Sequence, residues 1–79
     1  MDGWEEIDGV LERSFEFDSF PAAIAFVDRL AEAAEAANHH PDIDIRYRHV
    51  TVRWTTHSFG GVTDRDREMA ALTANLGQP

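Results

Sequence analysis

The stretch EAANHHPDIDIRYRHVTVRWTTHSFGGVTDRD, residues 35–66, spans the end of one regular element, two alternating segments and the start of another. Pro41 pushes the residue before it out of the α region, so a helix that enters this stretch is expected to end at His39 or His40. Apolar and polar residues then alternate over 42–47 and again over 50–55. Such alternation is typical of half-buried β-strands.

The two alternating segments predict a β-hairpin. With Arg48 and His49 as its turn, Asp44 comes opposite Arg53 on one face, and both apolar sets fall on the other face. We expect His49 to be an exposed turn residue without a role. The apolar face is expected to belong to the core, and it consists of Ile43, Ile45, Tyr47, Val50, Val52 and Trp54.

Another hairpin is predicted at the start of the chain, where Asp8-Gly9 separates two apolar-flanked runs. A type I′ turn needs positive φ at both central residues, and Asp-Gly meets this requirement well. If Ile7 pairs with Val10, one face of the hairpin is apolar. That face carries Trp4, Leu11, Phe15 and Phe17.

The segment between the hairpins predicts an amphipathic helix of roughly five turns. Asp18 or Ser19 can cap it, and Pro21 is tolerated in the first turn. Its apolar residues recur at three- and four-residue spacing, at Phe20, Ile24, Val27, Leu30, Ala31 and Ala34. A second apolar flank, formed by Ala22, Phe26, Ala33 and Ala37, suggests a contact with another subunit, or else Phe26 packs under a loop.

The last helix is expected to start at Thr63, with Asp66 in a capping-box position and Gly77 as its stop. Met69, Leu72 and Leu76 form the predicted buried stripe. The element order is therefore ββαββα. We predict an α+β fold, a two-layer sandwich in which a four-stranded antiparallel sheet carries both helices on one face, as a single domain over residues 1–79.

Composition limits the possible functions. The 79 residues include seven basic and fifteen acidic side chains, which give a net charge of −8, so direct nucleic-acid binding is not expected. There is no cysteine for a disulfide or a thiolate metal site. No signal peptide or membrane span is predicted, and we expect a cytoplasmic protein. Because so short a chain has a modest core, self-association is also expected.

Three of the four histidines, His39, His40 and His57, lie close to predicted element ends. Histidine exchanges protons near neutral pH, which suits general acid and base catalysis. Two other interpretations stay open for these side chains. Together with Asp66 they could bind a metal ion, although adjacent residues rarely ligate one ion with good geometry. His40 and His57 could also be partly buried histidines with satisfied hydrogen bonds.

Six motifs occur together along the chain: Gly3-Trp4, Phe15-x-Phe17-x-x-Phe20, Glu35-x-x-x-His39-His40-Pro41, Tyr47, Val50-x-Val52-x-Trp54-x-Thr56-His57 and Gly61-Val62-Thr63-x-x-Asp66. With this combination the sequence resembles the pterin-4a-carbinolamine dehydratase family, whose eukaryotic members also serve as dimerisation cofactors of a homeodomain transcription factor. The resemblance covers nearly the whole chain. His-His-Pro alone would be a weak signal, whereas the six motifs together are specific.

The resemblance implies dehydration of 4a-hydroxytetrahydropterin to quinonoid dihydropterin, a step of tetrahydropterin recycling, with no metal and no cofactor. It implies that His39 and His57 are the acid and base, in either assignment, and that His40 orients the pterin. Glu35 and Asp66 are expected to bond the pterin or a histidine, and Thr56 is expected to bind substrate. The implied assembly is a homodimer or homotetramer. A non-catalytic dimerisation or regulatory module of the same fold is the remaining alternative.

Overall fold

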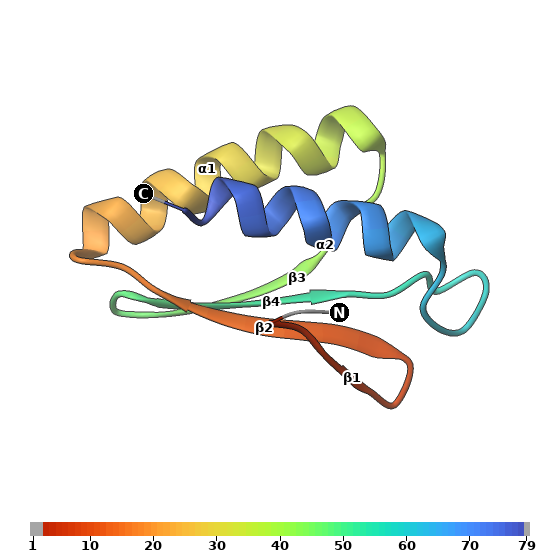
Figure 1. The fold of residues 1–79 in the computed structure, drawn as a ribbon. Helices are drawn as coiled ribbons and strands as arrows, with labels where there is room; N and C mark the ends of the chain where they lie inside the picture. Colours follow the sequence, from red (N-terminus) through yellow and green to blue (C-terminus); the bar gives the residue numbers. More distant parts are fainter. Residues whose placement is uncertain (1–2, 79) are drawn as a thin grey trace.

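The computed structural model describes residues 3–78, so the first two residues and the last one of the expected 1–79 domain lie outside it. The described residues form four strands and two helices: β1 (Glu5–Ile7), β2 (Val10–Glu16), α1 (Phe20–Ala37), β3 (Asp42–Arg46), β4 (His49–Trp54) and α2 (Asp64–Leu76). The strands make one antiparallel sheet in the order β1-β2-β4-β3, and both helices cover the same face (Figure 1). The predicted fold class and element order are confirmed.

The β1–β2 hairpin has the predicted register. Asp8 and Gly9 both have positive φ, 50° and 78°, as the turn requires, and Ile7 pairs with Val10. The tip of this hairpin rests on a later loop, because the Thr55 hydroxyl donates to the Gly9 carbonyl at 2.8 Å.

The β3–β4 hairpin differs from the prediction by two residues in register. Arg46 pairs with His49 and Asp44 with Thr51, so the turn lies one residue earlier than expected. A shift of two keeps every side chain within β3 and β4 on its predicted face. The predicted pairing of Asp44 with Arg53 is therefore wrong, while the prediction of one shared apolar face holds.

Tyr47 explains the shifted turn. It adopts a left-handed conformation with φ 54°, and its side chain is 68% exposed, so the prediction of a core tyrosine is wrong. Neither Gly nor Asn is present at this turn to mark the positive φ in the sequence. His49 belongs to β4 and not to the turn, and its exposed ring lies 3.6 Å from Glu16.

Helix α1 begins and ends at side-chain and backbone caps. The Ser19 hydroxyl accepts from the Ala22 N–H at 3.2 Å, and Asn38, in the left-handed region, ends the helix before the histidines. The buried residues Ala23, Phe26, Leu30 and Ala34 form its inner face. Phe26 is fully buried against Phe15 of β2 and Phe17 of the β2–α1 turn, so the expected contact of this side chain with another subunit is wrong. The exposed phenylalanine of this helix is Phe20.

Helix α2 starts with the predicted capping box of Thr63 and Asp66, and its C-cap is Gly77. Its buried face consists of Asp66, Met69, Ala70 and Thr73. Leu72 is 39% exposed, so its place in the predicted stripe is wrong. Two polar anchors turn the helix this way: the hydrogen bonds of buried Asp66, and a 3.0 Å bond from the Trp54 indole N–H to the Thr73 hydroxyl.

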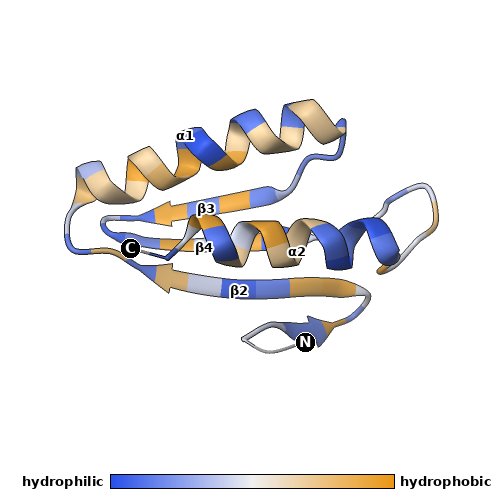
Figure 2. Cartoon of the chain, turned by 45° about the horizontal axis from the view of Figure 1, so that its top comes forward, coloured by the Kyte–Doolittle hydropathy of each residue, from blue (hydrophilic) through white to orange (hydrophobic). Residues whose placement is uncertain are grey.

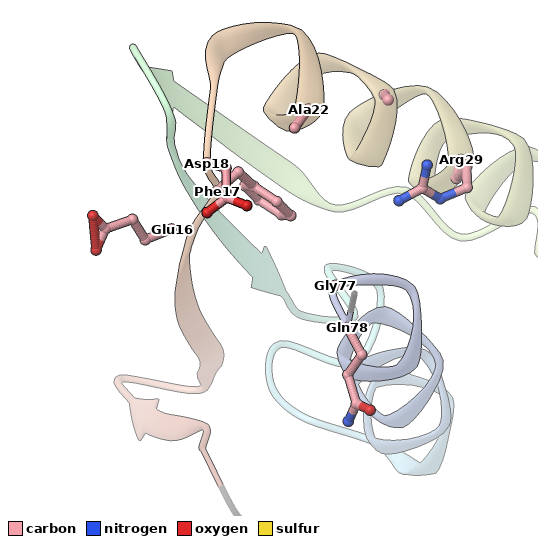
Figure 3. Close-up of a pocket in the computed structure, with 8 residues that line it drawn as sticks. Glu16, Phe17, Asp18, Ala22, Arg29, Gly77 and Gln78 are labelled. Carbon is pink, nitrogen blue, oxygen red and sulfur yellow. The ribbon is translucent and has the colours of Figure 1, made fainter.

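The helices and the sheet form two layers. Figure 2 shows α1 beside β3, and α2 over β4 and β2, with apolar residues in every one of these elements. A cavity of about 340 Å³ lies between the β2–α1 turn, the first half of α1 and the end of α2 (Figure 3). Neither helix in the described part of the chain has the combined length and apolar character of a membrane-spanning segment.

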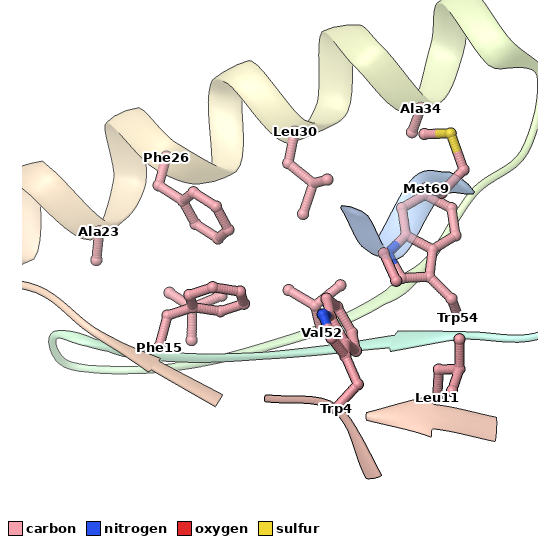
Figure 4. Close-up of a cluster of buried hydrophobic side chains, with 12 residues drawn as sticks. Trp4, Leu11, Phe15, Ala23, Phe26, Leu30, Ala34, Val52, Trp54 and Met69 are labelled. Atoms are coloured by element: carbon pink, nitrogen blue, oxygen red, sulfur yellow. The ribbon is translucent and has the colours of Figure 1, made fainter. Parts of the chain in front are cut away.

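The hydrophobic core fills the space between sheet and helices (Figure 4). At one end Phe26 packs on Phe15, with ring centroids 5.1 Å apart. At the other end Trp54 is fully buried beside Met69. This second end of the core supports the polar residues described next.

Candidate active site

A polar cavity of about 280 Å³ lies where α1 and β4 end and α2 begins. It is lined by Asn38, His39, His40, Thr55, Thr56, His57, Ser58 and Arg65. The larger cavity in Figure 3 has no histidine in its lining. Because the groups capable of proton transfer gather in the smaller cavity, we take it as the candidate site despite its size.

Asp66 is the buried centre of the site, with no exposed surface. One carboxylate oxygen accepts from His39 Nε2 at 2.5 Å. The other accepts from the Thr56 hydroxyl at 2.7 Å and from the backbone N–H of Thr63 at 2.8 Å. Asp66 therefore caps α2 and holds a histidine of the cavity at the same time.

The protonation of Asp66 follows from these contacts. Burial raises the pKa of its carboxyl group, but the hydrogen bonds from His39, Thr56 and the Thr63 backbone outweigh burial and lower the pKa below its ordinary value. The carboxylate is therefore ionised at neutral pH and can only accept. It follows that His39 Nε2 carries a proton and that Nδ1 is the ring nitrogen left for other partners.

His39 is buried between polar and aromatic neighbours, with 9% of its surface exposed. Its ring lies over that of Trp54, with centroids 5.3 Å apart and planes tilted by 32°. Trp54 is in turn fixed by its bond to Thr73. The orientation of the His39 imidazole is thus set from two directions, by the carboxylate and by the indole.

His40 faces the solvent side of the same cavity. Its Nε2 lies 2.8 Å from a carboxylate oxygen of Glu35, one turn back on α1, and both side chains are largely exposed. An exposed pair of this kind contributes little to stability. Glu35 does not line the cavity, so it reaches the site through His40.

His57 is placed by a tight loop over residues 56–61. The Thr56 N–H donates to the Gly61 carbonyl at 3.0 Å, and the Gly60 N–H donates back to the Thr56 carbonyl at 2.8 Å. Gly60 has φ 85°, a conformation that favours glycine. The loop presents His57 and Ser58 to the cavity and leaves Phe59 largely exposed.

Four of the predicted site residues, His39, His40, Thr56 and His57, line this one cavity. Glu35 and Asp66 do not line the cavity, but each is bonded to a histidine that does. The Thr56 hydroxyl is occupied by Asp66 and by Thr63, at 2.7 and 2.9 Å. The sequence reasoning missed Arg65 because its contacts are with the distant end of α1, and only its place directly before Asp66 gave a signal.

The histidines and carboxylates of the cavity were also candidates for binding a metal ion. Within residues 3–78, no group of three or more His, Cys, Asp or Glu side chains is arranged to hold a metal ion. Two of the nitrogen atoms that such a site could use already have carboxylate partners, His39 Nε2 with Asp66 and His40 Nε2 with Glu35.

Known proteins have sequences and folds similar to those of this chain. The family model described as Pterin 4 alpha carbinolamine dehydratase matches residues 1–76. A protein of Nocardia farcinica is 57% identical over 75 residues, which cover 95% of this chain and 79% of the relative. A protein of Mycolicibacterium vanbaalenii is 56% identical over 70 residues, covering 89% and 75%. Both carry the name "Putative pterin-4-alpha-carbinolamine dehydratase".

Two solved structures have the same fold. One, described as a transcriptional coactivator/pterin dehydratase from Brucella melitensis, has a TM-score of 0.93 at 36% identity and covers 99% of this chain and 85% of its own. The other, a pterin dehydratase-like protein described as a RuBisCO assembly factor in the alpha-carboxysome, has a TM-score of 0.82 at 26% identity, with coverage of 95% and 89%. On the family match and these identities, the chain belongs to the pterin-4a-carbinolamine dehydratase family.

Proposed function

We propose that this protein dehydrates 4a-hydroxytetrahydropterin to quinonoid dihydropterin by histidine acid/base catalysis, as a step of tetrahydropterin recycling. The observation that carries the proposal is the gathering of His39, His40 and His57 around one cavity, with a buried carboxylate bonded to the first of them. Family membership and the names of the relatives support the same reaction.

The reaction needs two proton transfers. The bond between C4a and its hydroxyl oxygen breaks, and the departing oxygen takes up a proton and leaves as water. The ring nitrogen bonded to C4a loses its proton, and its electron pair completes the C4a=N double bond. One acid and one base on either side of the ring are sufficient, and each is typically worth about 10²- to 10⁴-fold in rate.

The geometry supports a division of roles. Because Asp66 holds Nε2 of His39, we assign proton exchange with the pterin to Nδ1 of His39, with the carboxylate stabilising the imidazolium that forms. His57 is the second proton carrier, and either histidine can be the acid. His40, braced by Glu35, orients the ring at the open side of the cavity. We assign Thr56 to holding Asp66, since its hydroxyl is already bonded there.

The test is the rate of carbinolamine dehydration in metal-free buffer, followed by absorbance of the quinonoid product. We expect acceleration well above buffer, and losses of about 10²-fold or more for His39→Ala and His57→Ala. His49→Ala is the matched control, because the fourth histidine lies on β4 outside the cavity and should leave the rate unchanged. Folded protein that gives no acceleration would refute the proposal, and loss of rate in chelator would favour a metal site.

A non-catalytic, partner-binding role is the second candidate. It is favoured by one observation, that a structural neighbour at 26% identity is described as a RuBisCO assembly factor. An active wild type whose rate depends on the three histidines would remove this alternative as the sole function.

We also propose a homo-oligomer. Three large apolar side chains stay exposed, Phe20 at the start of α1, Ile45 on β3 and Tyr47 in the β3–β4 turn, at 48%, 40% and 68%. Ile45 belongs to β3, which is an edge strand of the sheet formed by residues 3–78. Exposed apolar side chains and a free strand edge both favour association.

A further inference from the structure

Arg65, the second residue of α2, reaches across to the end of α1. One of its guanidinium nitrogens donates to the carbonyl oxygens of Ala37 and Asn38, at 3.3 and 3.0 Å. Helix ends leave such carbonyls without intrahelical donors, and the backbone dipole favours a cation there. Because the last turn of α1 has no basic residue of its own, Arg65 supplies the cation from another helix.

Asp66, the next residue of α2, makes a second contact with the segment between α1 and β3. Asp66 bonds the ring of His39, which directly follows Asn38. The first turn of α2 therefore bonds both the backbone directly before the two histidines and the ring of His39. Arg65 also lines the cavity with His40 and His57.

We propose that Arg65 is a positioning residue, which ties the α1–β3 connection to α2 so that His39 and His40 keep their place relative to His57. This inference rests on the proposed dehydratase function of the cavity.

The end of α1 does not need Arg65 in order to form. The N–H groups of Asn38 and His39 already donate to the carbonyls of Glu35 and Ala34, both at 3.1 Å. The bonds from Arg65 are exposed to solvent, so their removal should change global stability little. What Arg65 adds is the link between the two helices, and its loss should loosen residues 37–40 while the fold persists.

The test compares Arg65→Gln and Arg65→Lys with Arg67→Gln. The control removes the same charge from the same helix, but Arg67 pairs with Asp64 at 2.8 Å within α2 and does not line the cavity. Amide hydrogen exchange and the ¹⁵N NMR signals of the histidine rings are recorded without substrate. The kcat, KM and pH profile of dehydration are measured alongside.

For Arg65→Gln we expect exchange of the Asn38 and His39 amides to rise about tenfold, the scale of one lost charge-assisted bond. The ring signals of His39 and His40 should shift, and kcat should fall about tenfold or more, since small misplacements of catalytic groups cost up to ~10²-fold. KM and the urea midpoint should change much less. Arg65→Lys should recover part of each loss, because its ammonium group can still donate to one carbonyl, and Arg67→Gln should resemble wild type.

Unchanged exchange and ring signals in Arg65→Gln would overturn the link itself, whether or not the protein is active. Loosened amides with kcat and pH profile as in wild type would overturn the positioning role. A wild type without dehydratase activity would refute the proposed function, and the ring signals alone would then decide whether Arg65 holds the histidines.

Discussion

Replacing Asp66 by Asn tests the physical basis of the site most directly. Asn has nearly the same shape, but it is neutral and has only one acceptor oxygen. The Thr63 backbone N–H is a fixed donor at 2.8 Å, so the amide oxygen must stay on that side. The amide NH₂ group then faces His39 Nε2, which can accept this bond only if its own proton moves to Nδ1.

The expected cost follows from the contacts. A hydrogen bond to a charged group contributes about 1.5–3 kcal/mol and a neutral one about 1 kcal/mol. Asp66 has no exposed surface and accepts charge-assisted bonds from three residues, of which the bond from His39 is the one most changed. We therefore expect Asp66→Asn to lower the free energy of unfolding by about 2 kcal/mol. Dehydration should slow at least about tenfold, because the tautomer of His39 is reversed.

Urea unfolding followed by tryptophan fluorescence measures the stability, and ¹⁵N NMR of the His39 ring identifies the protonated nitrogen. The control is Asp64→Asn, which changes the same charge in the same turn at a 93% exposed side chain and should stay within about 0.5 kcal/mol of wild type. If Asp66→Asn is as stable as this control, or if His39 keeps its proton on Nε2, the account of the site given above is wrong.

Further predictions concern pH, packing and assembly. The pKa of Asp66 is lowered on folding from an ordinary value of 3.8, so its ionised form stabilises the protein above that pH. This stabilisation is lost as the pH falls through the lower pKa of the folded state. Measuring the free energy of unfolding against pH should show this loss in wild type and not in Asp66→Asn. Trp54→Phe breaks a 3.0 Å hydrogen bond, whereas the indole N–H of Trp4 has no partner within residues 3–78. In urea unfolding, Trp54→Phe should therefore lower the free energy of unfolding by about 1 kcal/mol more than Trp4→Phe. The reverse order would contradict this reasoning. A methyl group on Gly77 would lie 2.7 Å from core ring atoms, so Gly77→Ala should destabilise by about 1–3 kcal/mol, and a neutral effect would mean that the ring can move. Phe20→Asp should lower the sedimenting mass without changing the circular dichroism, and an unchanged mass would exclude this residue from the interface.

Local chemistry made much of the fold readable in the sequence. Asp8-Gly9 specified a turn with two positive φ angles, and the hairpin formed in the predicted register. Ser19 and the Thr63/Asp66 pair marked helix starts, because capping depends on residues three positions apart. Alternation assigned strand faces correctly even where the register was wrong, since side chains repeat every two residues.

Tertiary contacts decided what local patterns left open. The turn at Tyr47 has no glycine or asparagine to announce it, so its position depended on the fit of β3 against the rest of the sheet. The apolar arc of α1 was too broad to show which side faces inward, and contact with Phe15 and Phe17 selected Phe26 over Phe20.

In the candidate site, too, some features followed from the sequence and others from the tertiary structure. The sequence by itself determined which residues are the candidates for the chemistry, because histidines and carboxylates were recognisable by type and spacing. Only the tertiary structure decided their partners: Asp66 with His39 across 27 positions, and Arg65 with the carbonyl of Asn38 across the same separation. Hydrogen bonds between residues so far apart in the chain depend on how the two helices pack on the sheet, which no short-range pattern encodes.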